Sequence, residues 1–139
     1  MVACKVYQGE ASVRTTDRFQ VLDVTNIVEE AVSKSGVTRG IASVYVPHTT
    51  CGITVNEAEP GLMRDIVEFL KEHTKPGAPW MHNRIDDNAH AHLGQSVLGH
   101  HASIPVADGR LYIGTWQRIL LVEMDGPRRR RIIITVIGE

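Results

Sequence analysis

The spacing of apolar and polar side chains predicts strands over much of the chain. From Lys5 to Thr15, apolar and polar side chains alternate with the period of a half-buried strand. Gly40–Val46 is a candidate buried strand, and Gly52–Val55 is its expected partner across a turn. Later strands are expected at Ser103–Val106, Leu111–Ile113, Arg118–Glu123 and Arg131–Ile137, with Asp108-Gly109 and Asp125-Gly126 as hairpin turns.

Two segments have a helical period instead. In Asn26–Val32 the apolar side chains share one helical face; Thr25 or Asn26 is placed to cap its start and Gly36 its end. A second helix is expected after Pro60, because its apolar side chains recur at helical spacing. Together these patterns predict an α+β fold: a sandwich-like, mostly antiparallel sheet with two main helices.

Length and charge limit the classes of protein. The 139 residues fit one domain, 1–139, which can bury a core without a disulfide or structural metal. A formal net charge of -1 argues against a nucleic-acid partner, and no apolar run approaches the roughly 20 residues that cross a membrane. Because only Cys4 and Cys51 occur and Met1–Lys5 lacks a secretory-signal profile, we expect a reduced, cytoplasmic protein.

The candidate chemistry gathers around the histidines. Asp86–Leu93 contains two carboxylates followed by His90 and His92, one residue apart. On an extended segment the two imidazoles would lie on one face and could share a metal ion, with His48 as a third ligand. The alternative interpretation is a polar, solvated loop whose histidines bind nothing.

Several blocks resemble one family. They are Pro47–Glu57, Asp86–Leu93, and Gly114–Gln117 followed by Asp125–Arg128, in the expected order along nearly the whole chain. The chain resembles the YjbQ family, whose members are often labelled secondary thiamine-phosphate synthase enzymes. The resemblance implies a compact α+β domain assembled as a homotrimer, a site of histidines and acidic residues near the subunit boundaries, and a bound divalent metal, commonly zinc.

The resemblance also selects metal ligands. His48 and His92 lie in its motifs, and His82 matches the family's aromatic-x-His pattern after Trp80. These three are the predicted ligands, with His90 competing with His82 for the third place. His73, His100 and His101 lie outside the motifs and are interpreted as surface residues.

Other motif residues are candidates for catalysis and substrate binding. Glu57 and Asp87 are predicted to move protons or to orient a ligand histidine, the alternative being ordinary solvated carboxylates. Asn56 and Gln117 can position a substrate through their amides. In the run that begins at Arg128, a pair of arginines can hold a phosphate or form salt bridges.

Two motif residues have plainer interpretations. Trp116 is interpreted as a core aromatic, and Cys51 as a buried, inert thiol rather than a nucleophile.

These features lead to one hypothesis and two rivals. The leading hypothesis is a zinc-dependent enzyme acting on a small phosphorylated metabolite by phosphoester or diphosphate chemistry, with weak thiamine-phosphate synthase activity. The first rival is a non-catalytic protein that binds a metal or a phosphorylated metabolite in the same pocket. The second is a set of histidines that collects metal only during purification.

Overall fold

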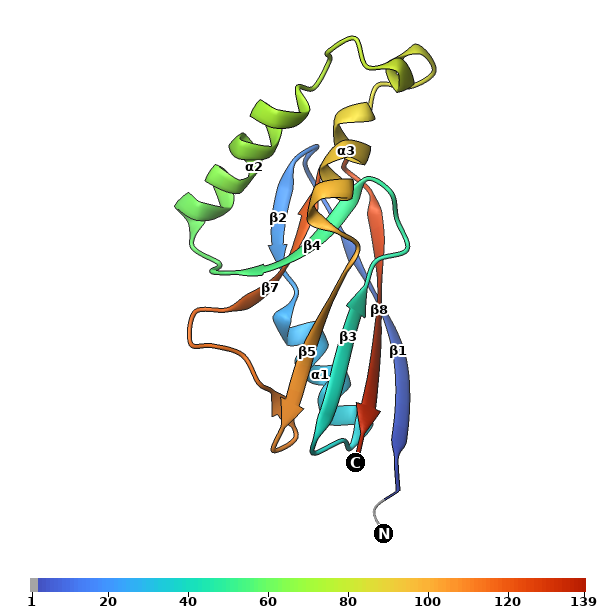
Figure 1. The fold of residues 1–139 in the computed structure, drawn as a ribbon, viewed down its shortest axis with the longest axis vertical. Coiled ribbons are helices and arrows are strands. Elements are labelled where there is room, and N and C mark those ends of the chain that lie inside the picture. The colour runs from blue at the N-terminus through green and yellow to red at the C-terminus, as the bar shows by residue number, and fades with distance from the viewer. Residues whose placement is uncertain (1–2) are drawn as a thin grey trace.

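Two antiparallel sheets form the framework of the chain (Figure 1). The computed structural model describes residues 3–139. Met1 and Val2 lie outside this range, so the start of the predicted domain 1–139 and of the Met1–Lys5 segment, expected to lack a secretory signal, is not described. The larger sheet has the order β1-β8-β3-β5-β6 and the smaller one β2-β7-β4. Their bounds are β1 Lys5–Arg14, β2 Gln20–Asp23, β3 Gly40–Tyr45, β4 Cys51–Asn56, β5 His101–Ala107, β6 Arg110–Leu111, β7 Arg118–Glu123 and β8 Arg129–Gly138.

Within the described residues, three α-helices and one 3-10 helix accompany the sheets: α1 Thr25–Ser35, α2 Pro60–Thr74, η1 Met81–Arg84 and α3 Ala89–Leu98. The expected end of α1 is confirmed, because Gly36 adopts the left-handed conformation with φ 68. Its start differs: no side chain caps the helix, and the Thr25 N–H instead donates to the Asp23 carboxylate. Among the helices described, none is both long and apolar enough to cross a membrane.

The predicted α+β class with antiparallel pairing is confirmed, but two predicted pairings are wrong. Gly40–Val46 and Gly52–Val55 are not partners, because β3 lies in the larger sheet and β4 in the smaller one. Asp125-Gly126 is not a hairpin turn, because it carries the chain from β7 in the smaller sheet to β8 in the larger one. Local turn residues could not reveal these crossings, since both sheets are held by pairings between distant segments. Asp108-Gly109 does turn between the paired strands β5 and β6.

The core lies on both sides of β7. Ile119 and Leu121 pack into the main cluster, which fills the space between the two sheets and α1. Val122 and Met124 belong to a second cluster beneath α2 and α3, with Leu70 and Ala91. Burial on both faces accounts for the unbroken apolar run of this strand.

Helix α3 approaches this core unusually closely, and Gly94 makes the approach feasible. A Cβ at Gly94 would lie 2.3 Å from the Met124 sulfur, so a larger residue would push α3 away from the end of β7. The sequence did not predict this helix, which contains both histidines of the His-x-His pair.

The outer face of the larger sheet carries an exposed apolar row. The strand register places Val6 beside Ile137, Ile137 beside Ile41, and Ile41 beside Pro105. Val6 is 70% exposed, Ile41 54% and Ile137 48%. Such a contiguous apolar strip is more typical of a contact surface than of a solvated sheet face.

Candidate active site

A pocket of ≈ 470 Å³ forms where the chain crosses twice between the sheets. One wall is the β3–β4 crossing, residues 47–50, and another is the β7–β8 crossing at Asp125 and Arg128. The 3-10 helix and the start of α3 contribute the third wall. The pocket is lined by Pro47, His48, Thr49, Thr50, His82, Asp86, Asn88, His92, Asp125, Arg128 and Arg130.

His82 is oriented by a chain of hydrogen bonds that begins at a buried carboxylate. The Asn88 Nδ2 donates to Asp125 Oδ2 at 2.9 Å, which leaves Asn88 Oδ1 as an acceptor. The His82 Nε2 lies 3.1 Å from that oxygen and therefore carries the proton. His82 Nδ1 then has a free lone pair. Hydrogen-bonded partners of this kind hold ligand histidines in metal sites.

His92 lies directly against His82. The ring centroids are 4.6 Å apart in an edge-to-face arrangement. Partial burial, followed by the nearby His82 ring, holds the pKa of His92 below its ordinary value, so the ring is neutral at neutral pH. A neutral imidazole is the form that binds a metal.

His48 has a different hydrogen-bonding pattern. Its Nε2 accepts a bond from the Arg131 backbone N–H at 2.9 Å, so the neutral ring carries its proton on Nδ1. Burial, followed by the positive charges of Arg130 and Arg131, lowers the pKa of His48. In this orientation His48 offers a donor to an anion more readily than a lone pair to a metal.

An ion pair is buried beneath the pocket. Arg130, 3% exposed, forms a two-pronged bond to Glu123, 0% exposed, and also donates to Thr50 Oγ1 at 2.9 Å. Thr15 Oγ1 donates to the same carboxylate at 2.7 Å. The neighbouring Arg129 and Arg131 lie on the opposite, exposed face of β8.

Arg128 and Asp125 form the charged wall of the pocket. The Arg128 Nε donates to the Asp125 backbone oxygen at 2.8 Å and its Nη2 to Asp125 Oδ2 at 2.9 Å. Burial alone would raise the pKa of Asp125, but hydrogen bonds from Asn88 and Arg128, with the charges of Arg128 and Arg18, lower it overall. Gly126 holds this turn tight, since a Cβ there would lie 2.2 Å from the Asp17 backbone oxygen.

The prediction that His90 and His92 lie on one face of an extended segment is wrong. Both are on α3, where residues two apart point in widely different directions. His90 is 1% exposed, packs on Phe19 and bonds the Met124 backbone oxygen through Nε2 at 2.9 Å. Of the two histidines that competed for the third place, only His82 lines the pocket.

Four other predicted site residues lie outside this pocket. Asp87 is on its rim, exposed and paired with Arg18 at 3.5 Å. Glu57, Asn56 and Gln117 lie at the opposite ends of β4 and β7. Trp116 lies there too; it is 72% exposed, so its interpretation as a core aromatic is wrong.

Sequence reasoning missed the buried members of the site. Asn88 is 6% exposed and Asp125 7% exposed, yet together they orient His82. Asp125 belongs to a motif used for the family resemblance, but its apparent role as a turn residue concealed its contacts. Glu123 closes a predicted strand, and no local signal distinguishes a buried carboxylate there from a solvated one.

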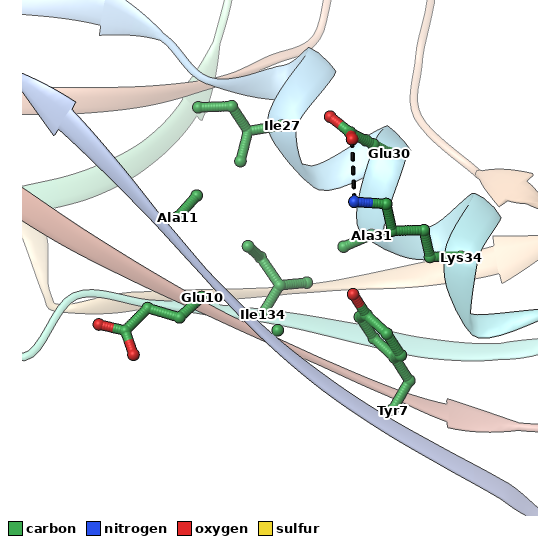
Figure 2. Close-up of a pocket in the computed structure, with 9 residues that line it drawn as sticks. Tyr7, Glu10, Ala11, Ile27, Glu30, Ala31, Lys34 and Ile134 are labelled. Carbon is green, nitrogen blue, oxygen red and sulfur yellow. Dashed lines mark ion pairs between the residues drawn. The ribbon is translucent and has the colours of Figure 1, made fainter.

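A smaller depression of ≈ 210 Å³ between β1 and α1 offers less chemistry (Figure 2). Lys34 is paired with Glu30 at 3.0 Å, as the dashed line in Figure 2 marks. Glu10 points away from the helix in this view and pairs with Arg131. With these charges paired, the histidine pocket is the stronger candidate site.

A metal fits part of the histidine pocket. His82 and His92 offer adjacent imidazoles, and Asp86 adds a carboxylate to the lining. Within residues 3–139, however, no group of three or more His, Cys, Asp or Glu side chains is already arranged to hold an ion. A complete site therefore requires the exposed side chains of His82 and Asp86 to adjust around the metal beside the partly buried His92.

The chain belongs to the YjbQ-like family of UPF0047 proteins, whose family model matches residues 9–139. A UPF0047 protein of Archaeoglobus fulgidus is 42% identical over 128 residues, covering 92% of this chain and 99% of the relative. YugU, a UPF0047 protein of Bacillus subtilis, is 38% identical over 130 residues, covering 91% of this chain and 96% of YugU.

Solved structures share the whole fold. The crystal structure of a YbjQ-like protein of unknown function from Sulfolobus solfataricus has a TM-score of 0.97 and 48% identity, covering 99% of this chain and 100% of that one. A hypothetical protein from Aeropyrum pernix has a TM-score of 0.93 and 58% identity, covering 95% and 98% of the two chains.

Proposed function

We propose that the histidine pocket binds a divalent metal, zinc, and a small phosphorylated metabolite, and that the protein is an enzyme of phosphoester or diphosphate chemistry. The observation that carries the proposal is the Asp125–Asn88–His82 chain. It ends in a free imidazole nitrogen beside the neutral ring of His92. Histidine, carboxylate and an open position make a donor set that zinc accepts.

The residues of this chain divide into two groups by role. His82, His92 and Asp86 would hold the ion, which lowers the pKa of bound water or polarises a phosphoryl oxygen when it is present. Arg128, fixed by Asp125, presents a guanidinium for the substrate phosphate. His48 takes the role of hydrogen-bond donor to the substrate's anionic group through Nδ1–H rather than that of a third ligand, because its Nε2 is engaged by the Arg131 N–H.

This assignment replaces Glu57 and Asp87 as proton-transfer groups. Neither lines the pocket of its own chain, and Asp87 is already paired with Arg18. Their absence from the pocket wall favours the second candidate, a protein that binds the metal and a phosphorylated metabolite without turnover. Catalytic turnover with metal-loaded protein separates the two functions.

Metal content is the first test. Untagged protein purified without added metal should contain about one zinc ion per chain, by mass spectrometry with inductively coupled plasma, as expected for one site. His92→Ala should lose it, while His73→Ala, on the exposed surface of α2, should retain it. Wild-type protein that neither contains nor takes up a divalent metal would refute the metal site.

A substrate screen follows on the loaded protein. The screen uses phosphorylated metabolites as substrates and includes an assay of thiamine-phosphate formation. We expect turnover that His92→Ala abolishes and His73→Ala preserves. Saturable binding with no chemistry above that of the free metal would instead support the binding protein. If the protein contains much less than one metal ion per chain, and mild chelation removes it, the histidines collected the metal during purification.

The family resemblance adds an assembly to the proposal. We propose a homotrimer in the reducing cytoplasm, consistent with the exposed apolar row on the larger sheet and with two free thiols, Cys4 and Cys51. Light scattering should give three times the chain mass, and Ile41→Lys in the middle of the row should lower it. A monomeric wild type would contradict the assembly.

A further inference from the structure

A separate pocket of ≈ 480 Å³ lies at the other ends of β4 and β7. Both strands therefore run from the histidine pocket to this one. The second pocket is formed by the segment before α2 and by the loop that precedes β7. It is lined by Asp23, Glu57, Ala58, Glu59, Pro60, Thr115, Trp116 and Arg118.

Trp116 is held in an exposed position by a closed turn. The Gly114 N–H donates to Gln117 Oε1 at 2.7 Å, and the Gln117 N–H donates to the Gly114 oxygen at 3.1 Å. The indole nevertheless remains 72% exposed. The loop therefore places an accessible aromatic ring in the lining of the pocket.

Glu57 is the unpaired carboxylate of this pocket. Asp23 is bonded to Arg118 at 2.7 Å, and Glu59 accepts the Gly61 and Leu62 N–H groups at the start of α2. Glu57, by contrast, is a partly exposed residue whose carboxylate has no hydrogen-bond or ion-pair partner in the part of the chain that the structure describes. Its own backbone N–H is satisfied by Asn56 Oδ1 at 2.8 Å.

We propose that this second pocket binds a small organic cation, a quaternary or protonated amine, between the Trp116 ring and the Glu57 carboxylate. An indole face attracts a cation through its quadrupole, and tryptophan is the strongest aromatic partner for such an ion. The free carboxylate supplies the opposite charge. Arg118, neutralised by Asp23, leaves the pocket without an unpaired positive charge to repel the ligand.

Trp116 reports on this site directly. In a Trp80→Phe background it is the remaining tryptophan, because the chain has 2. Choline chloride should change its fluorescence saturably, whereas sodium chloride at equal ionic strength should not. Dimethylbutanol, the uncharged carbon analogue of choline, should bind about two- to fivefold more weakly, the range expected for loss of a cation–π contact at an exposed site.

Two variants and a control test the residues. Calorimetry should show choline binding weakened by up to about fivefold for Glu57→Gln, as expected for loss of a partly exposed ion pair, and no measurable binding for Trp116→Leu. Glu72→Gln, an exposed carboxylate on α2, should bind as wild type. The proposal would be overturned if dimethylbutanol bound as tightly as choline, or if Glu57→Gln bound choline as tightly as wild type. It would also be overturned if Trp116 emission shifted to the blue as subunits associate, because the ring would then be buried in a subunit interface.

Discussion

Replacing Arg130 with methionine should cost the protein much of its stability. The substitution keeps most of the side-chain volume but leaves the Glu123 carboxylate buried without its cation. Removing one partner of a buried ion pair costs about 3–5 kcal/mol. Thr15 Oγ1 and the Met124 and Asp125 N–H groups still bond this carboxylate, so we expect the lower end, about 3 kcal/mol.

Arg129 provides a matched control. It is adjacent to Arg130 in the chain, on the exposed face of β8, and its Nε bonds only Ser12 Oγ, at 3.2 Å, among residues 3–139. Arg129→Met should therefore change the free energy of unfolding by no more than about 0.5 kcal/mol. Comparing the two variants separates the cost of leaving a buried charge unpaired from the cost of losing an arginine as such.

Urea unfolding followed by circular dichroism measures both variants. At a slope of about 1.5 kcal/mol per molar urea, Arg130→Met should lower the midpoint by about 2 M. All proteins need the same chain concentration, because subunit association would add to stability. Glu123→Gln in the Arg130→Met background should recover part of the loss. A loss below about 1 kcal/mol, or an equal loss in Arg129→Met, would refute the reasoning.

Three further predictions concern the histidine pocket and the thiols. Asn88→Leu breaks the chain that orients His82 and should weaken zinc binding about 10–100-fold in a chelator competition, while an unchanged affinity would remove its positioning role. Because the folded pKa of Asp125 is lowered, its stabilising effect is complete above the unfolded value of about 3.9 and is lost as pH falls through the lower folded value. Asp125→Asn should therefore flatten the acid limb of stability against pH in denaturant titrations, unlike Asp65→Asn on the exposed side of α2; equal acid limbs would contradict this. Burial raises the pKa of Cys51 to about 12, so a thiol reagent should modify exposed Cys4 in the native protein and Cys51 only after unfolding. Equal native rates would show that Cys51 is accessible.

The sequence predicted elements better than it predicted their pairing. Period-two alternation located β1, a short apolar run located β8, and the 3.6-residue period located α1 and α2. Strand partners come from segments far apart in the chain, so no local pattern could place β3 and β4 in different sheets. Helix α3 was missed because its buried Ala89, Ala91 and Gly94 are small residues that leave no clear apolar stripe.

The candidate site was predicted only in part, because its residues too are brought together from segments far apart in the chain. The motifs led to His48, His82, His92 and Arg128, which the fold brings into one pocket. The helical conformation of α3 then separated His90 from His92. The motif residues Glu57 and Gln117 went to the far ends of β4 and β7, because a strand extends about 3.3 Å per residue and carries its two ends apart.

The two crossings between the sheets also restrict how such a chain can change. The β3–β4 and β7–β8 crossings are connected through Arg130 to Thr50 and through the Arg131 N–H to His48. An inserted residue in either segment would displace the pocket and the alignment of the sheets together. The Asp108-Gly109 turn follows the end of β5 that pairs with Gly40, and in the part of the chain that the structure describes it does not line the histidine pocket. We therefore expect insertions to be tolerated at that hairpin, while new chemistry in the pocket must arise by exchanging side chains on a backbone of fixed length.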